Sequence, residues 1–445
     1  MTSTDFKTPS KYANDVNQAI DDDSDGLRRL SLQIHGRPEL GYEEVFAHKT
    51  LTDYMEEKGF KVTRHAFGID TAFVAEYESS ATSAAIATGQ KVKSIGFCSE
   101  YDALPGIGHA CGHNLIAISG VAAALGVKAG LEKHNLPGRV RLVGTPAEET
   151  TGGKIPLIEK GAFDGLEACM MTHPSPADIV YTTILSVGGI QVEYFGKASH
   201  ASASPWEGVN ALDAMVTAYN GIGLLRQQMP PTSRVHSIVT HGGQAANIIP
   251  DYAAGKILYR ATSFADHAKL RDQVLKIVNA AAESSGCTVK VTEEMNYKPV
   301  PHNELLAARY AGYTTDLGVK YIPRAMQEAA PSGSTDMGNV AHYLPGIHPV
   351  FNIANLESII DTSVSNHSIE FTELAKTDIA HRATLRSAKG LALTGMDVLA
   401  EPGFAKAVRD DFEARVPNAG KESVSSLQQK LSAFGVVTSG GCGCH

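Results

Sequence analysis

The order of apolar and polar residues along the chain predicts an α/β protein built on a doubly wound, mixed but mostly parallel sheet. Three observations support this fold class. Apolar runs of strand length end in polar residues, apolar runs of helix length follow them, and glycine-rich loops separate the two. Strands that alternate with helices in this way pair in parallel, with helices on the sheet faces. A change of pattern in the middle of the chain indicates a second domain.

The first predicted element is a helix near the amino end. Residues 23–25 offer aspartate and serine caps, and Leu27, Leu30 and Ile34 share one helical face. The preceding residues 1–22 are expected to be flexible.

The predicted strands of the first domain each end in polar side chains. The run SIGFCSEYD is expected to be a buried strand ending at Asp102, and the loop PGIGHACGH then leads into the apolar helix LIAISGVAAALGV. Glu148 and Glu149 follow the strand-like run RVRLVGTPAEE, and His173 follows ACMM. A last helix is expected over 404–412.

A different texture runs from about 187 to 298. Ile190, Val192 and Tyr194 alternate with polar residues as in a half-buried strand, and the order of patterns is β-α-β-β-α-β, that of a ferredoxin-like module. It is an insertion, because the α/β pattern resumes near residue 302. The expected organisation is a flexible amino end (1–22), a main domain in two parts (23–186 and 299–416), an inserted domain (187–298) and a flexible tail (417–445).

Bulk composition excludes several classes of protein. The net charge of -9 and the pI near 6.0 argue against nucleic-acid binding, and no stretch is expected to span a membrane. The amino end has no apolar core of the kind that a secretory signal needs, so a cytoplasmic location is the default expectation.

Six cysteines in 445 residues do not make a disulfide scaffold. Cys98, Cys169 and Cys287 lie in apolar runs and are expected to be buried small hydrophobic residues. Cys442 and Cys444, in the terminal GGCGCH, form either a minor metal-binding tail or incidental thiols in a disordered one. Only Cys111 lies between histidines.

Metal-capable residues gather in five segments: GHACGH, PAEE, MTHP, KASHAS and SNHS. In an open α/β sheet, ligands bind outside the carboxyl ends of the strands, so Asp102, residues 108–113, the two glutamates and His173 are expected in one crevice. A thiolate, imidazoles and carboxylates together suit zinc, with Mn, Co or Ni as substitutes. Each signal alone has a plainer interpretation, a structural histidine or a solvated glutamate pair, and the joint occurrence favours a metal site.

The order of the motifs resembles one group of enzymes. The motifs are HGRPELGYEE, SEYDALPGIGHACGHN, GTPAEETTGG, THP, GKASHAS, GGQAANIIPD, GSTDMGN and SNHSIEF. The chain resembles the metal-dependent amidohydrolases and peptidases that include auxin-conjugate hydrolases, hippurate hydrolase, aminobenzoyl-glutamate hydrolase and the β-alanyl-lysine type of dipeptidase, and the second motif is most similar to that dipeptidase-like branch. The resemblance implies a catalytic domain with two metal ions and an inserted lid domain that mediates a homodimer.

Carried over position by position, the resemblance implies five metal ligands: Cys111, His113, Glu149, His173 and His367. Cys111 is expected to bridge the two ions, where other branches have an aspartate. Those branches also have a histidine ligand where this chain has Glu100. Asp102 matches an aspartate that orients a ligand, and a strand-end cap is its alternative role.

The resemblance also implies the catalytic groups. Glu148 matches the general base, and His200 with Asn247 matches the lid groups that stabilise the oxyanion, often across the dimer. Arg260 matches an arginine that holds a substrate carboxylate, with a surface salt bridge as the alternative. Asp336 either meets a cationic substrate amine or holds its loop. His35 is expected to be structural.

The leading hypothesis is therefore a hydrolase that cleaves the amide bond of small N-acyl amino acids or dipeptides, with no nucleic-acid or membrane partner. A catalytically inactive, metal-stabilised binding or regulatory protein on the same scaffold is the second hypothesis. A redox or nucleophilic Cys111 is the third, and it leaves PAEE and SNHS unexplained. The acyl group, the amine and the native metal stay open.

Overall fold

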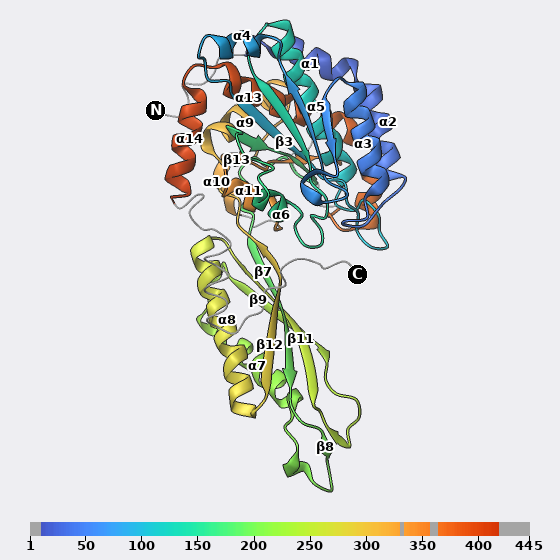
Figure 1. Cartoon of the computed structure of the whole chain (residues 1–445), viewed down its shortest axis with the longest axis vertical. Coiled ribbons are helices and arrows are strands. Elements are labelled where there is room, and N and C mark those ends of the chain that lie inside the picture. Colours follow the sequence, from blue (N-terminus) through green and yellow to red (C-terminus); the bar gives the residue numbers. More distant parts are fainter. Residues whose placement is uncertain (1–9, 330–332, 357–363, 418–445) are drawn as a thin grey trace. The chain divides into compact units, whose positions relative to one another are not determined.

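The computed structural model describes residues 10–329, 333–356 and 364–417, which form two compact units (Figure 1). The first unit comprises the described residues up to 183 together with 300–329 and 336–417, and the second comprises 184–299 and 333–335. The tail thiols Cys442 and Cys444 lie outside the described residues.

The first unit is built on a six-stranded sheet in the order β1-β2-β4-β3-β5-β13. The four strands from β4 to β13 run parallel, and β2 and β1 add antiparallel pairs at one edge, which confirms the mixed, mostly parallel sheet that was predicted. The strands are β1 (Lys61–Arg64), β2 (Phe73–Glu78), β3 (Ser94–Ser99), β4 (Arg139–Gly144), β5 (Ala168–Met170) and β13 (Gly346–Ile347), with a separate parallel pair, β6 (His173–Ser175) and β14 (Val350–Asn352).

The first unit also contains twelve described helices. They are α1 (Ala13–Asp22), α2 (Ser24–His35), α3 (Val45–Glu57), α4 (Ala81–Ala87), α5 (His113–Lys133), α6 (Lys154–Glu159), α9 (Glu304–Asp316), α10 (Arg324–Ala329), α11 (Met337–Ala341), α12 (Ile369–Leu374), α13 (Asp378–Ala400) and α14 (Phe404–Arg415), with a short 3-10 turn, η1 (Ala66–Gly68). Among these helices, α3, α5 and α13 contact strands of the sheet. The predicted helical face of Leu27, Leu30 and Ile34 is buried on α2.

Two expectations about this unit need correction. Residues 13–22, expected to be flexible, form α1, because Val16 and Ile20 are fully buried in the core. No stretch was expected to be able to span a membrane, but helix α5 is long and apolar enough to do so by length and composition. It is a core helix, and 83% of its most apolar window is buried inside the protein. Its Gly120 allows contact with β3, since a Cβ there would lie 2.6 Å from the Cys98 carbonyl oxygen.

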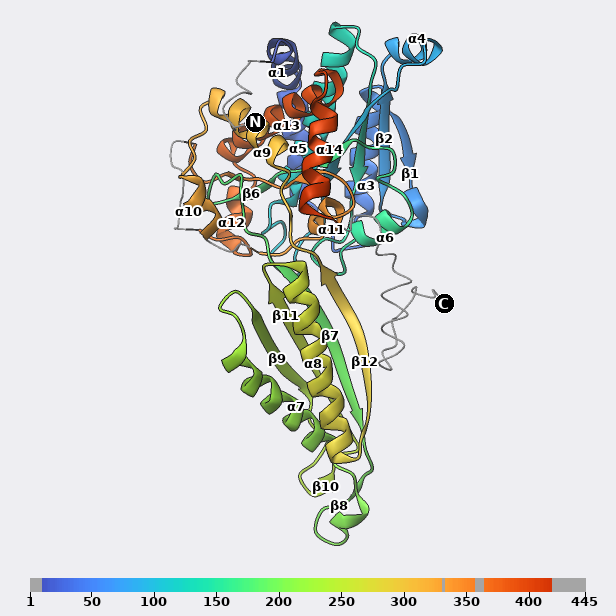
Figure 2. The same cartoon turned by 90° about the vertical axis from the view of Figure 1, so that its left-hand side faces the viewer.

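The second unit has the predicted β-α-β-β-α-β order. Its four-stranded antiparallel sheet runs β12-β7-β11-β9, and α7 and α8 cover one face (Figure 2). Asn210 and Ser263 cap the two helices through their side chains. The elements are β7 (Ser186–Phe195), β8 (Ser199–His200), η2 (Pro205–Glu207), α7 (Ala211–Leu225), η3 (Arg226–Gln228), β9 (Arg234–His241), β10 (Ile248–Ile249), β11 (Tyr252–Ala261), α8 (Phe264–Ser285) and β12 (Thr288–Tyr297).

Candidate metal centre and active site

The candidate site of the first unit lies where several chain segments leave the carboxyl ends of the sheet strands. Glu100 and Asp102 follow β3, Glu148 and Glu149 follow β4, and His173 begins β6, soon after β5. The residues therefore meet for the topological reason that the sequence suggested, since parallel strands present their carboxyl ends at one edge.

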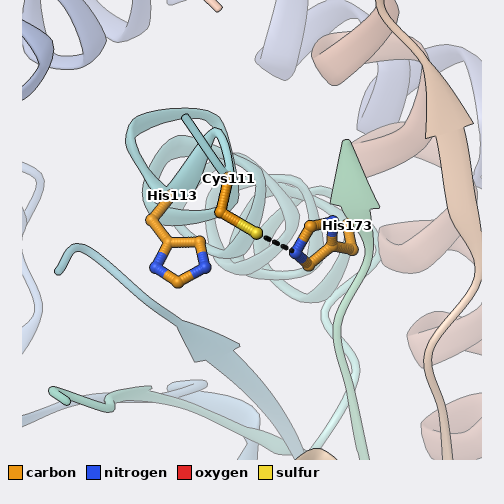
Figure 3. Close-up of side chains that lie close together, drawn as sticks. All are labelled: Cys111, His113 and His173. Atoms are coloured by element: carbon orange, nitrogen blue, oxygen red, sulfur yellow. Dashed lines mark hydrogen bonds between the residues drawn. The ribbon is translucent and has the colours of Figure 1, made fainter. Parts of the chain in front are cut away.

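Cys111 is at the centre of the predicted ligands. Its Sγ lies 3.3 Å from His173 Nε2 and 3.3 Å from His367 Nε2, and Figure 3 shows the thiol between the His113 and His173 side chains. Two groups, each with ligand atoms within 4.8 Å of one another, share this cysteine: Cys111 with His113 and His173, and Cys111 with Glu149 and His367. The structure thus brings all five predicted ligands together.

Unusual backbone conformations help to place these side chains. Gly112, between Cys111 and His113, has φ 75°, and a Cβ there would lie 2.5 Å from Pro174 Cγ. His367 itself has φ 64°, and its N–H donates to the Ala110 carbonyl at 2.9 Å. A non-glycine residue with positive φ is uncommon and stores strain that the surrounding contacts must offset. His367 thus carries such strain within a ligand loop.

Asp102 connects two of the ligand segments. Its Oδ1 lies 2.8 Å from His113 Nδ1, and its Oδ2 accepts the Glu149 N–H at 2.9 Å. A carboxylate on Nδ1 fixes the ring orientation and directs Nε2 toward the other ligands. The Nδ1 of His173 is fixed similarly, 2.7 Å from the Pro174 carbonyl oxygen. These contacts support the orienting role expected for Asp102.

Three buried side-chain atoms at this centre have no hydrogen-bond partner among the described residues: Glu100 Oε2, His113 Nε2 and Glu149 Oε1. They lie only at ion-pair distances from nearby groups: His113 Nε2 is 3.5 Å from Glu100 Oε2 and 3.8 Å from Glu149 Oε1, which is 3.4 Å from His367 Nε2. Buried polar atoms normally make hydrogen bonds, and a ligand among these atoms would satisfy them. Because they include a carboxylate oxygen and a ring nitrogen beside a thiol, a divalent cation fits this donor set.

The pKa values of the groups at this centre shift in different directions. Burial and the nearby Glu149 raise the pKa of the Cys111 thiol, and burial lowers the pKa of His173 to about 4. Burial also raises the pKa of Glu149, but the His367 and His113 rings outweigh it and lower that pKa to about 2. His173 is therefore a neutral imidazole and Glu149 an ionised carboxylate. Burial lowers the pKa of His113, but the Asp102 carboxylate outweighs it and raises that pKa well above its ordinary value, and Glu149 raises the pKa of His367. The thiol and these two rings have to lose a proton when an ion enters. A raised thiol pKa is the opposite of what a nucleophilic Cys111 requires.

Glu148 is next to the ligands but belongs to a different group. Its side chain is 8% exposed, and its carboxylate lies within 4.8 Å of Glu100 and His113 ligand atoms. Burial and the negative charges of Glu100, Glu149 and Asp336 raise the pKa of Glu148 well above its ordinary value. The preceding residue, Ala147, has φ 59°, and its N–H donates to the buried Glu44 carboxylate at 2.8 Å.

The surroundings of Asp336 distinguish between its two expected roles, meeting a cationic substrate amine and holding its loop. Asp336 is fully buried, and both of its oxygens accept hydrogen bonds from Lys154. Holding its loop is therefore the role that the contacts support. Lys154 was missed by sequence reasoning, because one lysine in TTGGKIPL carries no pattern and lysines are almost never fully buried.

The second unit carries His200 and Asn247 together. His200 on β8 pairs with Ile248 on β10, and the Ala201 N–H donates to the Asn247 carbonyl at 3.0 Å. Both side chains are exposed. Backbone N–H groups of Ser202 and Ala203 donate to His200 Nδ1, at 3.3 and 3.2 Å. In the neutral ring Nδ1 is then the acceptor, and Nε2 carries the proton.

Arg260 lies on β11, away from His200. It is half-buried, and its Nη1 donates to Ser334 Oγ at 2.8 Å. Within the part of the chain that the structure describes, no acidic side chain lies within ion-pair distance of Arg260, so its alternative role in a surface salt bridge gains no support. Outside the cluster, the His35 ring contacts the Thr372 carbonyl at 2.8 Å, as a structural histidine would.

Known proteins share both the sequence and the fold. Residues 186–285 match the family of peptidase dimerisation domains. Xaa-Arg dipeptidases from Mus musculus and Homo sapiens are each 43% identical to this chain, over 90% of its length and 91% of theirs. One component of the p-aminobenzoyl-glutamate hydrolase of Escherichia coli is 26% identical, over 89% and 94%. The crystal structure of a putative aminohydrolase from methicillin-resistant Staphylococcus aureus has the same fold, with a TM-score of 0.68 and 18% identity over 87% of this chain and 99% of that one.

Proposed function

Because the chain belongs to the M20 family of metallopeptidases, we propose a mechanism and a substrate class for the residues described above. Membership confirms the resemblance, and the protein is a metal-dependent hydrolase of dipeptides or N-acyl amino acids. The hypothesis of an inactive binding protein gains no support from the relatives.

We propose that two divalent ions, zinc in the native protein, are held by the five ligands around Cys111. The observation that carries this proposal is that one buried thiol belongs to two groups of ligand atoms, each compact enough for one ion. When bound, such ions supply Lewis-acid activation of water and of the substrate carbonyl. Thiolate and imidazole ligands favour zinc over magnesium or calcium.

Glu148 is the proposed general base. It adjoins the ligand Glu149 and lies beside His113 in a buried position, so its carboxylate can accept a proton from the attacking water. The carbon–nitrogen bond of the amide then breaks, and the same carboxyl returns the proton to the leaving amine nitrogen. General acid–base assistance of this kind contributes about 10²–10⁴-fold to the rate.

The second unit supplies the proposed substrate-binding groups. His200 Nε2–H is a donor for the oxyanion, and Nδ1 is held by two backbone N–H groups, which supports a fixed ring orientation. Asn247 lies beside it, and Arg260 is the proposed partner of the substrate carboxylate, to which its planar fork can make two bonds. The 43% identity to Xaa-Arg dipeptidases favours dipeptides with a basic carboxyl-terminal residue as substrates.

A homodimer would bring these groups onto one substrate. Arg260 is eight positions beyond Tyr252 on β11, which corresponds to roughly 26 Å of strand. Tyr252 pairs with Phe195, at the end of the sheet that leads to β8 and His200 (Figure 2). A dipeptide spans only about 7 Å, so His200 and Arg260 of one chain cannot both contact it. Light scattering should give twice the monomer mass, and an active monomer would contradict the dimer.

The replacement Glu148→Gln tests the mechanism. It should reduce kcat by about 10²–10⁴-fold, while metal content measured by mass spectrometry and the unfolding temperature stay at the wild-type values. Glu159→Gln, an exposed change on the same connection, is the control and should be fully active. Full activity of Glu148→Gln would refute the base, and a wild-type protein that binds no metal would refute the centre.

A further inference from the structure

Lys154 forms a fully buried ionic cluster with two carboxylates. Its Nζ lies 2.5 Å from Glu100 Oε1 and 2.6 Å from Asp336 Oδ1, and its backbone N–H donates to Asp336 Oδ2 at 2.9 Å. All three side chains are completely inaccessible to solvent. Buried charges are stable only when paired and hydrogen-bonded, so this cluster is unusually demanding for a core position.

The three residues come from separate segments of the first unit. Glu100 follows β3, Lys154 begins α6, and Asp336 precedes α11. Because Asp336 holds Lys154 through both its backbone and its side chain, the ammonium group has a fixed position. Lys154 in turn holds one oxygen of Glu100, which leaves the other oxygen with a defined direction.

That second oxygen, Glu100 Oε2, is buried at the metal centre. It lies 3.5 Å from His113 Nε2, and both atoms lack a hydrogen-bond partner among the described residues. Glu100, His113 and Glu148 also form a group of ligand atoms within 4.8 Å of one another. A carboxylate that served only as the counter-ion of Lys154 would gain little by burying its other oxygen 3.5 Å from a ring nitrogen without a hydrogen bond to it.

The charges in the cluster point the same way. Two carboxylates and one ammonium leave a net charge of -1 in a solvent-free place, and the ammonium of Lys154 is already bound to both carboxylates. A cation on the Glu100 Oε2 side would balance the cluster, and that side is where His113 Nε2 lies, 3.5 Å away. A protonated His113 ring can supply this charge while no metal is bound, and an ion held by Glu100 and His113 takes its place when metal binds.

We propose that Glu100 is an additional metal ligand, a second carboxylate besides Glu149, and that Lys154 is the positioning residue that aims it at the ion held by His113. The proposal rests on the metal centre of the proposed function and extends its ligand set from five residues to six. Lys154 contacts neither substrate nor metal in this arrangement.

Metal titration of the metal-free full-length protein tests this ligand. Zn²⁺ and Co²⁺ are added to wild type and to Glu100→Gln, which keeps the shape and leaves an oxygen for Lys154. One of the two metal equivalents should bind about 10–100-fold more weakly in the variant, and the Co²⁺ absorption spectrum should change because a ligand is lost. Asp397→Asn is the matched control, since Asp397 is a buried carboxylate on α13 that pairs with Tyr313 and Arg309 on α9, outside the metal groups.

Further variants keep the outcomes distinguishable. Glu100→Asp keeps the charge but is too short to reach both Lys154 and an ion, so it should also weaken one equivalent if Glu100→Gln does not fold. A folded Lys154→Met should reproduce the Co²⁺ spectrum of Glu100→Gln. Unchanged affinities and spectra in Glu100→Gln and Glu100→Asp would overturn the ligand, and an unchanged spectrum in Lys154→Met would overturn the positioning role. If wild type binds no metal at all, the proposed function itself fails.

Discussion

Most candidate groups of the first unit are buried or half-buried and held by partners, with His367 the exposed exception, whereas His200 and Asn247 of the second unit are exposed. His113 is completely inaccessible and contacts Asp102, and Cys111 is 9% exposed and contacts the candidate ligand His173. His200 and Asn247 lie in solvent beside the short β8–β10 pair. The difference indicates a metal centre that is organised before substrate arrives and a substrate-binding surface that acquires its contacts only when another molecule or chain meets it.

The two units also differ in what stabilises them. The first buries lysine, arginine, aspartate, glutamate and histidine side chains, so its stability depends on balanced charges. Among the described residues of the second unit, His267 is the only side chain of these types that is buried. Its core consists of the apolar faces of the sheet and of α7 and α8. Charge changes should therefore matter far more in the first unit.

The largest effect on stability should come from Lys154→Met. It leaves Glu100 and Asp336 buried without their cation, and removing one partner of a buried pair costs about 3–5 kcal/mol in the free energy of unfolding. Lys256→Met, which breaks the half-exposed pair with Glu294 in the second unit, is the comparison and should cost roughly 0.2–1 kcal/mol. Urea unfolding measures both. Equal losses in the two variants would remove the contrast between the units.

A change in the second unit should affect catalysis without affecting stability. His200→Ala removes an oxyanion donor, for which we expect a loss of about 2.7–4 kcal/mol in transition-state stabilisation, or about 10²–10³-fold in kcat. Metal content and unfolding temperature should stay unchanged because the side chain is exposed. Steady-state kinetics checks this, with the exposed His236→Ala as control. A variant that lost metal or stability instead would show that His200 has a structural role.

The smallest effect concerns pH and the one buried histidine of the second unit. Burial lowers the pKa of His267 to about 4 in the folded protein, below its ordinary value of 6.5. The unfolded chain therefore binds the proton first, and the stability contributed by the neutral ring is complete above pH 6.5 and is lost as the pH falls toward 4. The difference in unfolding free energy between wild type and His267→Gln should shrink over this window and stay constant between pH 7 and 8.5. A difference independent of pH would contradict the neutral buried ring.

Local patterns were sufficient to predict much of the fold. The alternation of strands and helices, the inserted β-α-β-β-α-β module and the helix over Leu27–Ile34 depend on residues close together in the chain, and the structure has all three. The meeting of Glu149 with His173 also followed from the sequence, because the topology of a parallel sheet brings strand ends together. Helix α1 was missed, since Val16 and Ile20 form a stable helix only by packing on α5 and α13.

The sequence by itself determined the family, the hydrolytic chemistry and the side chains able to bind metal, because each is encoded in short motifs that can be identified in order along the chain. Only the tertiary structure decided that Asp336 holds Lys154 and that the second oxygen of Glu100 faces His113. It also decided that Arg260 lies at one end of β11 while His200 lies beyond the other end. The reason is physical. Whether a charge can be buried, and which way it points, depends on partners 54 to 182 residues away that only the folded chain brings within hydrogen-bond distance.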